Sequence, residues 1–288
     1  MNAIDPAANQ APKSNQLVDC LGRVFIIAYK EPTQLLEEAL TREGLQCEVL
    51  RQEHKAEYKN FSPSYLCLLN HRRAWEIATK ESKPTLIVEA DFVPVLGFGK
   101  LPLPFNLNQS NVGVSWLYTC ATQVYSVSAE GYAEGFSVST VAYIVTPQSA
   151  QYLLELAEEI REKVGPTAYS SWDSNIDGFL RARSLKNYIP LRNYGEHGGL
   201  PNLEHQKNGL SKTHRADVLY GKLAFMPLYA TGEGSSQLKL LSVRLQARLK
   251  GIARLAVGKF LRVPVVQRSS VPARLVSFAV RRQLSMRL

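Results

Sequence analysis

Cysteine is scarce in this 288-residue sequence, and no two of its four cysteines form a C-x-x-C pair. Three of them, Cys47, Cys67 and Cys120, have apolar neighbours, so we expect small buried thiols in a reducing compartment. The spacing indicates neither a disulfide framework nor a zinc site.

Long apolar runs are absent as well. Charged residues interrupt every run before it reaches the roughly 20 apolar residues that a membrane-spanning helix needs. The first 16 residues, rich in Ala, Asn, Pro and Gln, lack the apolar region of a secretory signal. We therefore expect a disordered leader over residues 1–19 and a cytoplasmic protein that is soluble or peripheral.

Acidic residues are missing from the C-terminal segment. Between Ser235 and Leu288 the sequence has twelve Lys and Arg and no Asp or Glu, so the surplus of +9 lies wholly in this segment. The rest of the chain is slightly acidic. A basic surface of this kind favours a polyanion, which is either nucleic acid or the anionic face of a bilayer.

The N-terminal half alternates apolar runs with helical spacing. Residues Arg23–Tyr29 form a short apolar run typical of a buried parallel strand, Thr33–Glu43 has helical spacing and stops at Gly44, and Cys47–Leu50 resumes a strand. This β-α-β opening predicts parallel strands covered by helices. One α/β domain over residues 20–232 fits the chain length.

An acidic pair follows the next predicted strand. Ser62-Pro63-Ser64 can cap a helix over residues 65–80, and Thr85–Val88 then leads into Glu89 and Asp91, separated by Ala90. Open α/β sheets place their ligands at such strand ends, and paired carboxylates suit Mg²⁺ or Mn²⁺. Taken alone, the pair is equally a solvated strand end. Two more strands, at residues 113–118 and 139–145, and a helix over 146–163 follow.

The stretch Ser64–Pro94 resembles a segment of glycosyltransferase family 25. In that family a Cys-Leu-x-Ser-His-x-x-x-Trp helix precedes a Leu-Ile-x-Glu-Asp-Asp strand end. The matching positions here are Cys67, Leu68, Asn70, His71, Trp75, Leu86, Ile87, Glu89, Ala90 and Asp91. Two positions depart from the pattern: Ala90 replaces the middle Asp, and Asn70 replaces the Ser before the His. An inactive member is therefore an open alternative.

This resemblance implies a GT-A-like, Rossmann-like fold with a mixed, mostly parallel sheet flanked by helices. It implies a metal-dependent, inverting hexosyltransferase. The donor would be a nucleotide diphosphate sugar, expected to be a UDP-sugar, and the acceptor a glycan or glycolipid in lipopolysaccharide or other surface polysaccharide assembly. Glu89 and Asp91 would hold Mn²⁺ or Mg²⁺. The first strand would contact the nucleotide, through Ile27, Ala28 and Tyr29.

Further candidates come from polar residues near the matched segments. His71 either holds substrate or steadies the acidic turn, or it is a helix histidine satisfied by a carbonyl; Trp75 is expected in the core. Asp173 and Asp177, four residues apart, are candidates for the base that accepts the proton of the acceptor hydroxyl. The alternative for Asp173 is a helix N-cap.

A glycine-rich stretch, NYGEHGGLPNLEHQKNG, contains two further histidines. We favour His197 over His205 as an additional metal or phosphate ligand, because glycines surround it. Basic residues that follow would neutralise the leaving diphosphate, unless they are a chance surface cluster: Lys207, Lys212, His214 and Arg215.

The last segment, residues 233–288, predicts a basic amphipathic helical tail. From Leu238 an apolar stripe recurs at steps of three and four: Leu241, Leu245, Leu249, Ile252, Ala256, Phe260 and Val263. A second basic, apolar piece starts at Pro272. We expect contact with an anionic membrane surface, the alternative being a helix packed on the domain. Nucleic-acid binding is disfavoured, because no recognised motif accompanies the charge.

A second function from another class stays open on the sequence alone. The chain would then be a non-catalytic nucleotide-sugar or glycan-binding module, tethered to a membrane by its basic tail.

Overall fold

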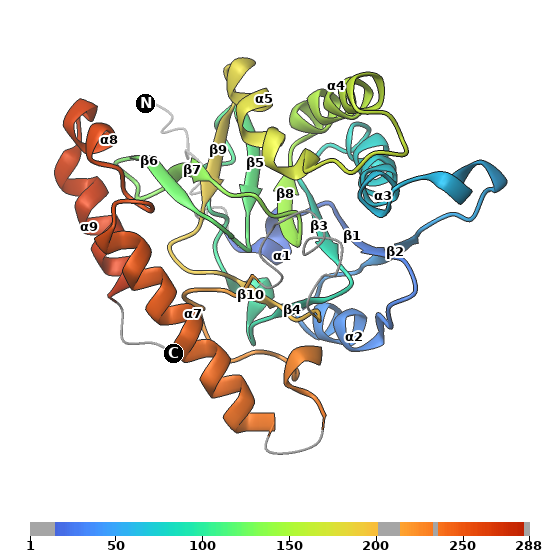
Figure 1. Cartoon of the computed structure of the whole chain (residues 1–288). Helices are drawn as coiled ribbons and strands as arrows, with labels where there is room; N and C mark the ends of the chain where they lie inside the picture. Colours follow the sequence, from blue (N-terminus) through green and yellow to red (C-terminus); the bar gives the residue numbers. More distant parts are fainter. Residues whose placement is uncertain (1–14, 201–213, 233–235, 285–288) are drawn as a thin grey trace, which may run out of the picture.

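The computed structural model describes residues 15–200, 214–232 and 236–284. Its centre is an eight-stranded sheet with the order β2-β1-β3-β8-β5-β9-β7-β6 (Figure 1). The strands are β1 (Arg23–Ala28), β2 (Glu48–Arg51), β3 (Thr85–Glu89), β5 (Val112–Trp116), β6 (Gln123–Val127), β7 (Ala133–Phe136), β8 (Ala142–Val145) and β9 (Lys186–Ile189).

Strand directions make the sheet mixed but mostly parallel. Strand β1 pairs in parallel with β2 and β3, and β5 pairs in parallel with β9. Strand β8 runs antiparallel between β3 and β5, and β7 runs antiparallel between β9 and β6. Only β8 and β7 therefore oppose the common direction. The predicted α/β fold class, a mixed, mostly parallel sheet flanked by helices, is confirmed.

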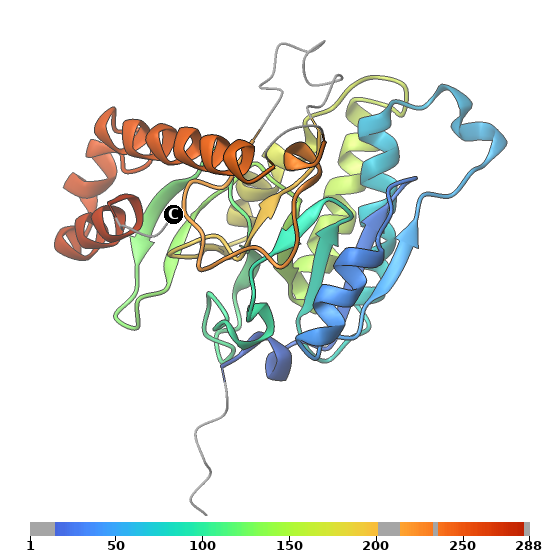
Figure 2. The same cartoon turned by 90° about the horizontal axis from the view of Figure 1, so that it is seen from below.

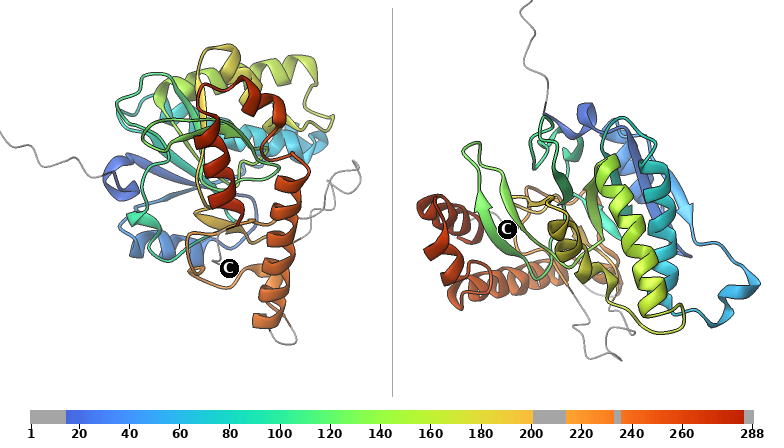
Figure 3. Two further views of the ribbon diagram at one scale, coloured as in Figure 1. Left: turned by 90° about the vertical axis from the view of Figure 1, so that its left-hand side faces the viewer. Right: turned by 90° about the horizontal axis from the view of Figure 1, so that it is seen from above.

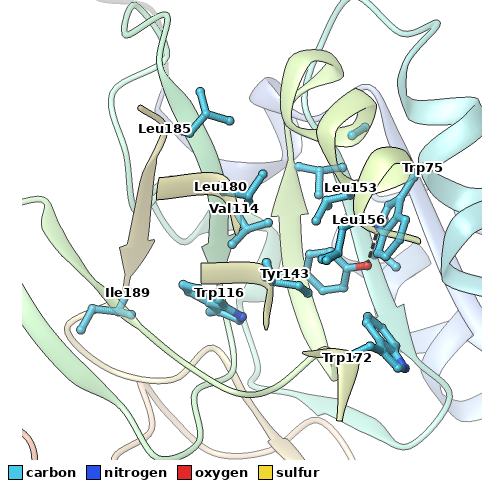
Figure 4. Packing of buried hydrophobic residues seen from close by; sticks show 14 of the residues in the cluster. Trp75, Val114, Trp116, Tyr143, Leu153, Leu156, Trp172, Leu180, Leu185 and Ile189 are labelled. Carbon is cyan, nitrogen blue, oxygen red and sulfur yellow. Dashed lines mark hydrogen bonds between the residues drawn. The ribbon is translucent and has the colours of Figure 1, made fainter. Parts of the chain in front are cut away.

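Helices cover both faces of the sheet (Figures 1 and 3). On one face, α3 (Pro63–Ala78) and α4 (Pro147–Lys163) lie side by side, next to α5 (Ile176–Ala182). Their apolar residues form one core cluster with alternate strand residues such as Ile87 and Tyr143 (Figure 4). On the other face, α1 (Leu17–Cys20) and α2 (Gln34–Arg42) cover Val24, Ile26 and Val88. The alternation follows from the two-residue period of a strand.

Small elements connect this framework. A two-stranded antiparallel sheet joins β4 (Phe92–Pro94), directly after the acidic turn, to β10 (Gly195–His197). The 3₁₀ helices are η1 (Ala56–Asn60), η2 (Phe98–Lys100), η3 (Trp172–Asn175) and η4 (Leu228–Ala230).

The C-terminal helices are built into the domain rather than attached to it. They are α7 (Ser236–Ala256), α8 (Val263–Arg268) and α9 (Pro272–Gln283), and α7 and α9 lie together at one edge of the molecule beside β6 (Figures 2 and 3). Phe260, Leu275 and Phe278 belong to the core cluster under α3 and α4. The predicted long helix stops earlier than expected, at Ala256, since Gly258 takes a left-handed φ of 67°.

Helix α7 faces the domain with its arginines. Its buried residues are Arg244, Ala247, Arg248 and Gly251, and Arg282 of α9 is fully buried too. The leucines of the predicted stripe point outward instead: Leu238, Leu241, Leu245 and Leu249 are each more than half exposed. The apolar stripe therefore exists in the structure. The side of α7 that was expected to carry solvated basic residues is, however, partly buried.

The N-terminal boundary also differs from the prediction. The disordered leader was expected to reach residue 19, but Leu17 lies in α1 and is fully buried. Its N–H donates to the carbonyl of Leu101 at 2.9 Å, and Asn15 accepts from the N–H of Leu103 at 2.9 Å. The folded body thus includes residues from Asn15 onward. Within the described residues, no helix has the length and apolarity needed to cross a membrane.

Candidate active site

The acidic turn lies at the C-terminal end of β3, and backbone hydrogen bonds connect it to both sides. Glu89 is the last residue of β3, and its N–H donates to the carbonyl of Val141 at 2.9 Å. The N–H of Ala90 donates to the carbonyl of Ile27 on β1 at 2.8 Å. These bonds fix the backbone that carries the two carboxylates.

Asp91 and His197 are brought together by the small sheet. His197 of β10 is opposite Phe92 of β4, and the N–H of Gly198 donates to the carbonyl of Asp91 at 2.7 Å. The His197 Nε2 and Asp91 Oδ2 atoms are 2.9 Å apart. Gly199 lies against the same carboxylate, because a Cβ at this position would come within 2.2 Å of Asp91 Oδ2. The glycines beside His197 thus allow close approach to the acidic turn.

The charges of this pair reinforce each other. Burial opposes ionisation of Asp91, but the neighbouring His197 and Arg215 outweigh it and lower the pKa of the Asp91 carboxyl. Burial likewise opposes protonation of His197, yet Asp91 and Glu89 raise the pKa of that imidazole. Arg215 donates to the carbonyls of His197 at 2.7 Å and Gly199 at 2.8 Å, so it also holds the loop.

A buried chain of polar groups leads from Trp75 through Tyr143 and His71 to Glu89. Trp75 Nε1 donates to the Tyr143 hydroxyl at 2.9 Å, as drawn in Figure 4, and that hydroxyl is 2.8 Å from His71 Nδ1. His71 Nε2 lies 3.4 Å from Glu89 Oε1 without a hydrogen bond between them, and that oxygen accepts from the Thr140 hydroxyl at 2.7 Å. His71 is fully buried between the Tyr143 hydroxyl and the Glu89 carboxylate.

A cavity of about 360 Å³ opens beside the two carboxylates. Ile27, Ala28 and Tyr29, which the sequence led us to expect at the nucleotide, line this cavity together with Glu89 and Asp91. Its volume is within the range of small-molecule sites, about 300–1,000 Å³. The remaining lining residues are Pro63, Leu66, Cys67 and Asn70 from the first half of α3, Glu31 after β1, Gln52 directly after β2, and Ala90 between the acids.

Asn70 connects two strands beside the cavity. Its side-chain N–H₂ group donates to the carbonyl of Ala28 at 3.1 Å and to that of Leu50 at 2.8 Å. Arg73 in turn donates to Asn70 Oδ1 at 3.0 Å. The side-chain amide of Asn70 thus connects the ends of β1 and β2. It holds these strand ends at a fixed separation beside the cavity.

The two candidate bases occupy different environments. Asp173, in η3, is partly buried, and burial, with the charge of Glu89, raises the pKa of its carboxyl to about 7. It is not the N-cap of α5, which is Asn175. Asp177 turns away: it accepts from Asn187 Nδ2 at 2.9 Å and from the Tyr125 hydroxyl at 3.3 Å. Of these two acids, only Asp173 is close enough to Glu89 for that charge to raise its pKa.

The donor atoms at the turn suit a divalent cation. Asp91 Oδ1 is buried and has no hydrogen-bond partner among the described residues, and neither has His197 Nδ1. Carboxylate oxygens and imidazole nitrogens are ligands that Mn²⁺ and Mg²⁺ accept. Among the described residues, the set whose ligand atoms all lie within 4.8 Å of one another is Cys67, His71 and Glu89, and it does not include Asp91 or His197. Sequence spacing missed this set, although Cys67 and His71 are one helical turn apart.

Three of the remaining predicted residues lie outside the described residues. They are Lys212, which was expected to meet the diphosphate, His205 and Lys207. His214 Nδ1 is 2.9 Å from the sulfur of Cys120. Three residues around Glu89 and Asp91 carried no recognisable sequence pattern: Thr140, Tyr143 and Glu196.

Comparison with known proteins gives no matching family model and no matching curated protein sequence. Three solved structures show distant likeness. A glycosyltransferase involved in glycosylation of the major capsid of PBCV-1 is 10% identical, with 59% of this chain and 81% of that chain covered and a TM-score of 0.39. A variant of Drosophila β1,4-galactosyltransferase 7, in complex with manganese, UDP-Gal and xylobiose, is 11% identical over 67% and 75% at 0.33. CTP:phosphocholine cytidylyltransferase from Streptococcus pneumoniae is 10% identical over 58% and 89% at 0.29. Likenesses this weak carry no argument about function.

Proposed function

We propose that the protein is a metal-dependent glycosyltransferase that uses a nucleotide diphosphate sugar. The observation that carries the proposal is the position of Glu89 and of the Asp91–His197 pair at the end of a buried strand, where both carboxylates line a cavity that the end of β1 also lines. Such an arrangement combines a cation site for the diphosphate with a cavity for the planar nucleobase. A nucleotide diphosphate sugar requires both.

Each part of the site has a role in this proposal. Ile27, Ala28 and Tyr29 contact the nucleotide, and Asn70 keeps that wall in place. Glu89, Asp91 and His197 hold Mn²⁺ or Mg²⁺. When bound, the cation neutralises the diphosphate and so makes it a better leaving group. His71 positions Glu89.

Asp173 acts as the base in this proposal. It accepts the proton of the acceptor hydroxyl as that hydroxyl attacks the anomeric carbon, which corresponds to inversion at that carbon. A pKa of about 7 suits a base that works near neutral pH. The resemblance to glycosyltransferase family 25 extends the proposal to a hexose donor, expected to be a UDP-sugar, and to a glycan or glycolipid acceptor of surface polysaccharide or lipopolysaccharide.

The experiment combines ligand protection with turnover. UDP-galactose, UDP-glucose and UDP-N-acetylglucosamine are tested for protection against thermal unfolding, with Mn²⁺ and with EDTA, and then for donor hydrolysis. We expect one donor to protect only with Mn²⁺ and to be hydrolysed, and Asp91→Asn to lose both effects. Equal turnover by Asp91→Asn and the wild type would contradict the assignment.

The same cavity also supports a second candidate function, a nucleotide-sugar or glycan-binding module without catalysis. Ala90 favours it, because this residue lines the cavity where the family has a third carboxylate. Metal-dependent protection without any donor hydrolysis, for every donor tested, is the outcome that selects this candidate.

We further propose that the protein is peripheral on the inner face of a membrane, and that α7 makes the contact. The exposed leucines Leu238, Leu241, Leu245 and Leu249, called here the leucine ridge, follow one side of the helix. The surrounding segment has only basic charges, which complements an anionic bilayer, each basic residue contributing about 1 kcal/mol near such a surface.

Vesicle sedimentation tests this contact. The wild type should sediment with phosphatidylglycerol vesicles, and the variant Leu241→Gln/Leu245→Gln should stay in the supernatant with an unchanged melting temperature. If the wild type does not sediment, or if the ridge variant sediments equally well, the membrane proposal is wrong. Size-exclusion chromatography at high protein concentration shows whether a second copy covers the ridge instead.

A further inference from the structure

A second cavity, of about 640 Å³, lies between β6, α5 and the segment that connects α7 to α9. It is lined by basic and hydroxyl side chains and by no acidic residue. The residues that matter here are Arg181, Arg262, Arg268, Tyr125, Ser269 and Ser270. Its volume falls within the range of small-molecule sites, about 300–1,000 Å³.

The arginines gather around one aromatic ring. The guanidinium carbon of Arg181 lies 4.6 Å from the centroid of the Tyr125 ring, and that of Arg262 lies 5.8 Å from the same centroid. The Tyr125 hydroxyl donates to Asp177, so the ring is fixed from the other end. Two like charges are thus held on one ring, an arrangement that a bound anion would stabilise.

No carboxylate of the described residues forms an ion pair with Arg181, Arg262 or Arg268. Asp177, the acid next to the cavity, is buried and accepts from Asn187 and Tyr125, and the charge of Arg181 favours its ionised form without an ion pair between them. The arginine side chains are exposed to the cavity mouth and remain open to a ligand.

The backbone that carries these arginines is anchored to the sheet. The N–H of Val124 on β6 donates to the carbonyl of Phe260 at 3.0 Å, and Arg254 donates to the carbonyl of Thr122 at 3.0 Å. The Ser269 hydroxyl accepts from the N–H of Val271 at the start of α9. The cavity wall is therefore a fixed part of the fold.

We propose that this cavity binds a phosphate group. Guanidinium groups bind phosphate oxygens by paired, charge-assisted hydrogen bonds, and the neighbouring hydroxyls of Ser269 and Ser270 can donate to the same oxygens. The cavity has room for more than the phosphate, so the ligand is a phosphorylated molecule. Its source is either a phosphorylated sugar or the headgroup of a phospholipid. This inference stands independently of the proposed function.

Isothermal titration calorimetry tests it with three probes: inorganic phosphate, glucose 6-phosphate and dihexanoyl phosphatidic acid below its critical micelle concentration. The variant is Arg181→Gln/Arg262→Gln, and the matched control is Lys239→Gln/Lys250→Gln, which removes the same charge from exposed positions of α7. A second variant, Arg268→Glu, places a negative charge in the cavity. Melting temperatures show that each variant folds.

We expect the wild type and the control to bind at least one organic phosphate more tightly than inorganic phosphate. The double variant should bind it at least tenfold more weakly, and Arg268→Glu should not bind it. The preferred organic probe identifies the source. The proposal is overturned if no probe binds at millimolar concentration, or if the control loses as much affinity as the double variant. Titration of UDP with Mn²⁺ into the double variant should give the wild-type Kd, which separates this cavity from the one beside Glu89.

Discussion

Helices α3 and α7 both bury polar side chains, with opposite consequences for their apolar residues. Helix α3 buries Asn70 and His71 together with Leu68 and Trp75, so polar and apolar residues share one inward face. Helix α7 buries Arg244 and Arg248 and leaves the leucine ridge exposed. The two helices differ in what lies beneath them.

Beneath α3 are strand ends and hydroxyl groups, and its polar residues organise a ligand cavity around them. Beneath α7 is a set of buried acids. Arg244 donates to Glu196 at 2.8 Å, and Arg282 donates to Asp217 at 2.9 Å, where Gln283 also binds. A hydrophobic stripe therefore locates one side of a helix, but the partners available in the fold decide which side faces inward.

The largest expected effect is in the candidate active site, at Asp173. Asp173→Asn should lower kcat by about 10²–10⁴-fold, because the base that accepts the acceptor proton is removed, with little change in donor affinity. Steady-state kinetics with the donor identified above measures this. The control is Asp177→Asn, whose effect should be below tenfold, and equal losses in both variants would contradict the distinction between the two acids.

On the α7 side, Arg244→Met should destabilise the fold. It leaves Glu196 buried without its cationic partner, which costs about 3–5 kcal/mol. Urea unfolding measures the free energy, and Lys250→Met, exposed on the same helix, should change it by less than about 0.5 kcal/mol. If Arg244→Met matches Lys250→Met, the buried pair does not anchor the helix.

A smaller effect, on metal binding, is expected from a change in the loop after β10. Gly199→Ala should weaken Mn²⁺ binding by about 10-fold, the lower end of the range for groups that support metal ligands, because the added Cβ displaces the Asp91 carboxylate. Gly221→Ala is the matched control, since a Cβ there meets nothing within 4 Å. Unchanged Mn²⁺ affinity in Gly199→Ala would show that this carboxylate position is not needed.

A further expected effect concerns how the free energy of unfolding depends on pH. Asp173 has a pKa of about 7 in the folded protein and ionises near 3.9 when unfolded, so between these values the folded state holds one proton more. The Asp173 contribution to the free energy of unfolding should therefore fall as pH rises from about 4 to 7. Subtracting the Asp173→Asn profile from that of the wild type isolates it, and a flat difference would place the carboxyl in water.

Local sequence carried much of the fold and part of the candidate site. The acidic turn was predictable because a buried strand and its following residues are adjacent in the chain, and the glycines around His197 indicated close backbone approach. The arrangement of Ile27, Ala28 and Tyr29 along the cavity followed from the parallel order of β1 and β3.

Other features depend on partners that are far apart in sequence. Asn70 spans two strand ends that no spacing rule connects to it. The burial of Arg244 depends on Glu196, 48 residues away. Asp177 looked equivalent to Asp173 by helical spacing, and only the positions of Asn187 and Tyr125 separate their roles.

The most direct test of the account is calorimetric titration of UDP into the wild type and into Asp91→Asn, each with Mn²⁺ and with EDTA. We predict binding to the wild type with Mn²⁺, and binding at least tenfold weaker with EDTA or after the Asp91→Asn change. Equal UDP affinity in all four titrations would contradict the claim that these carboxylates hold a cation against a nucleotide diphosphate.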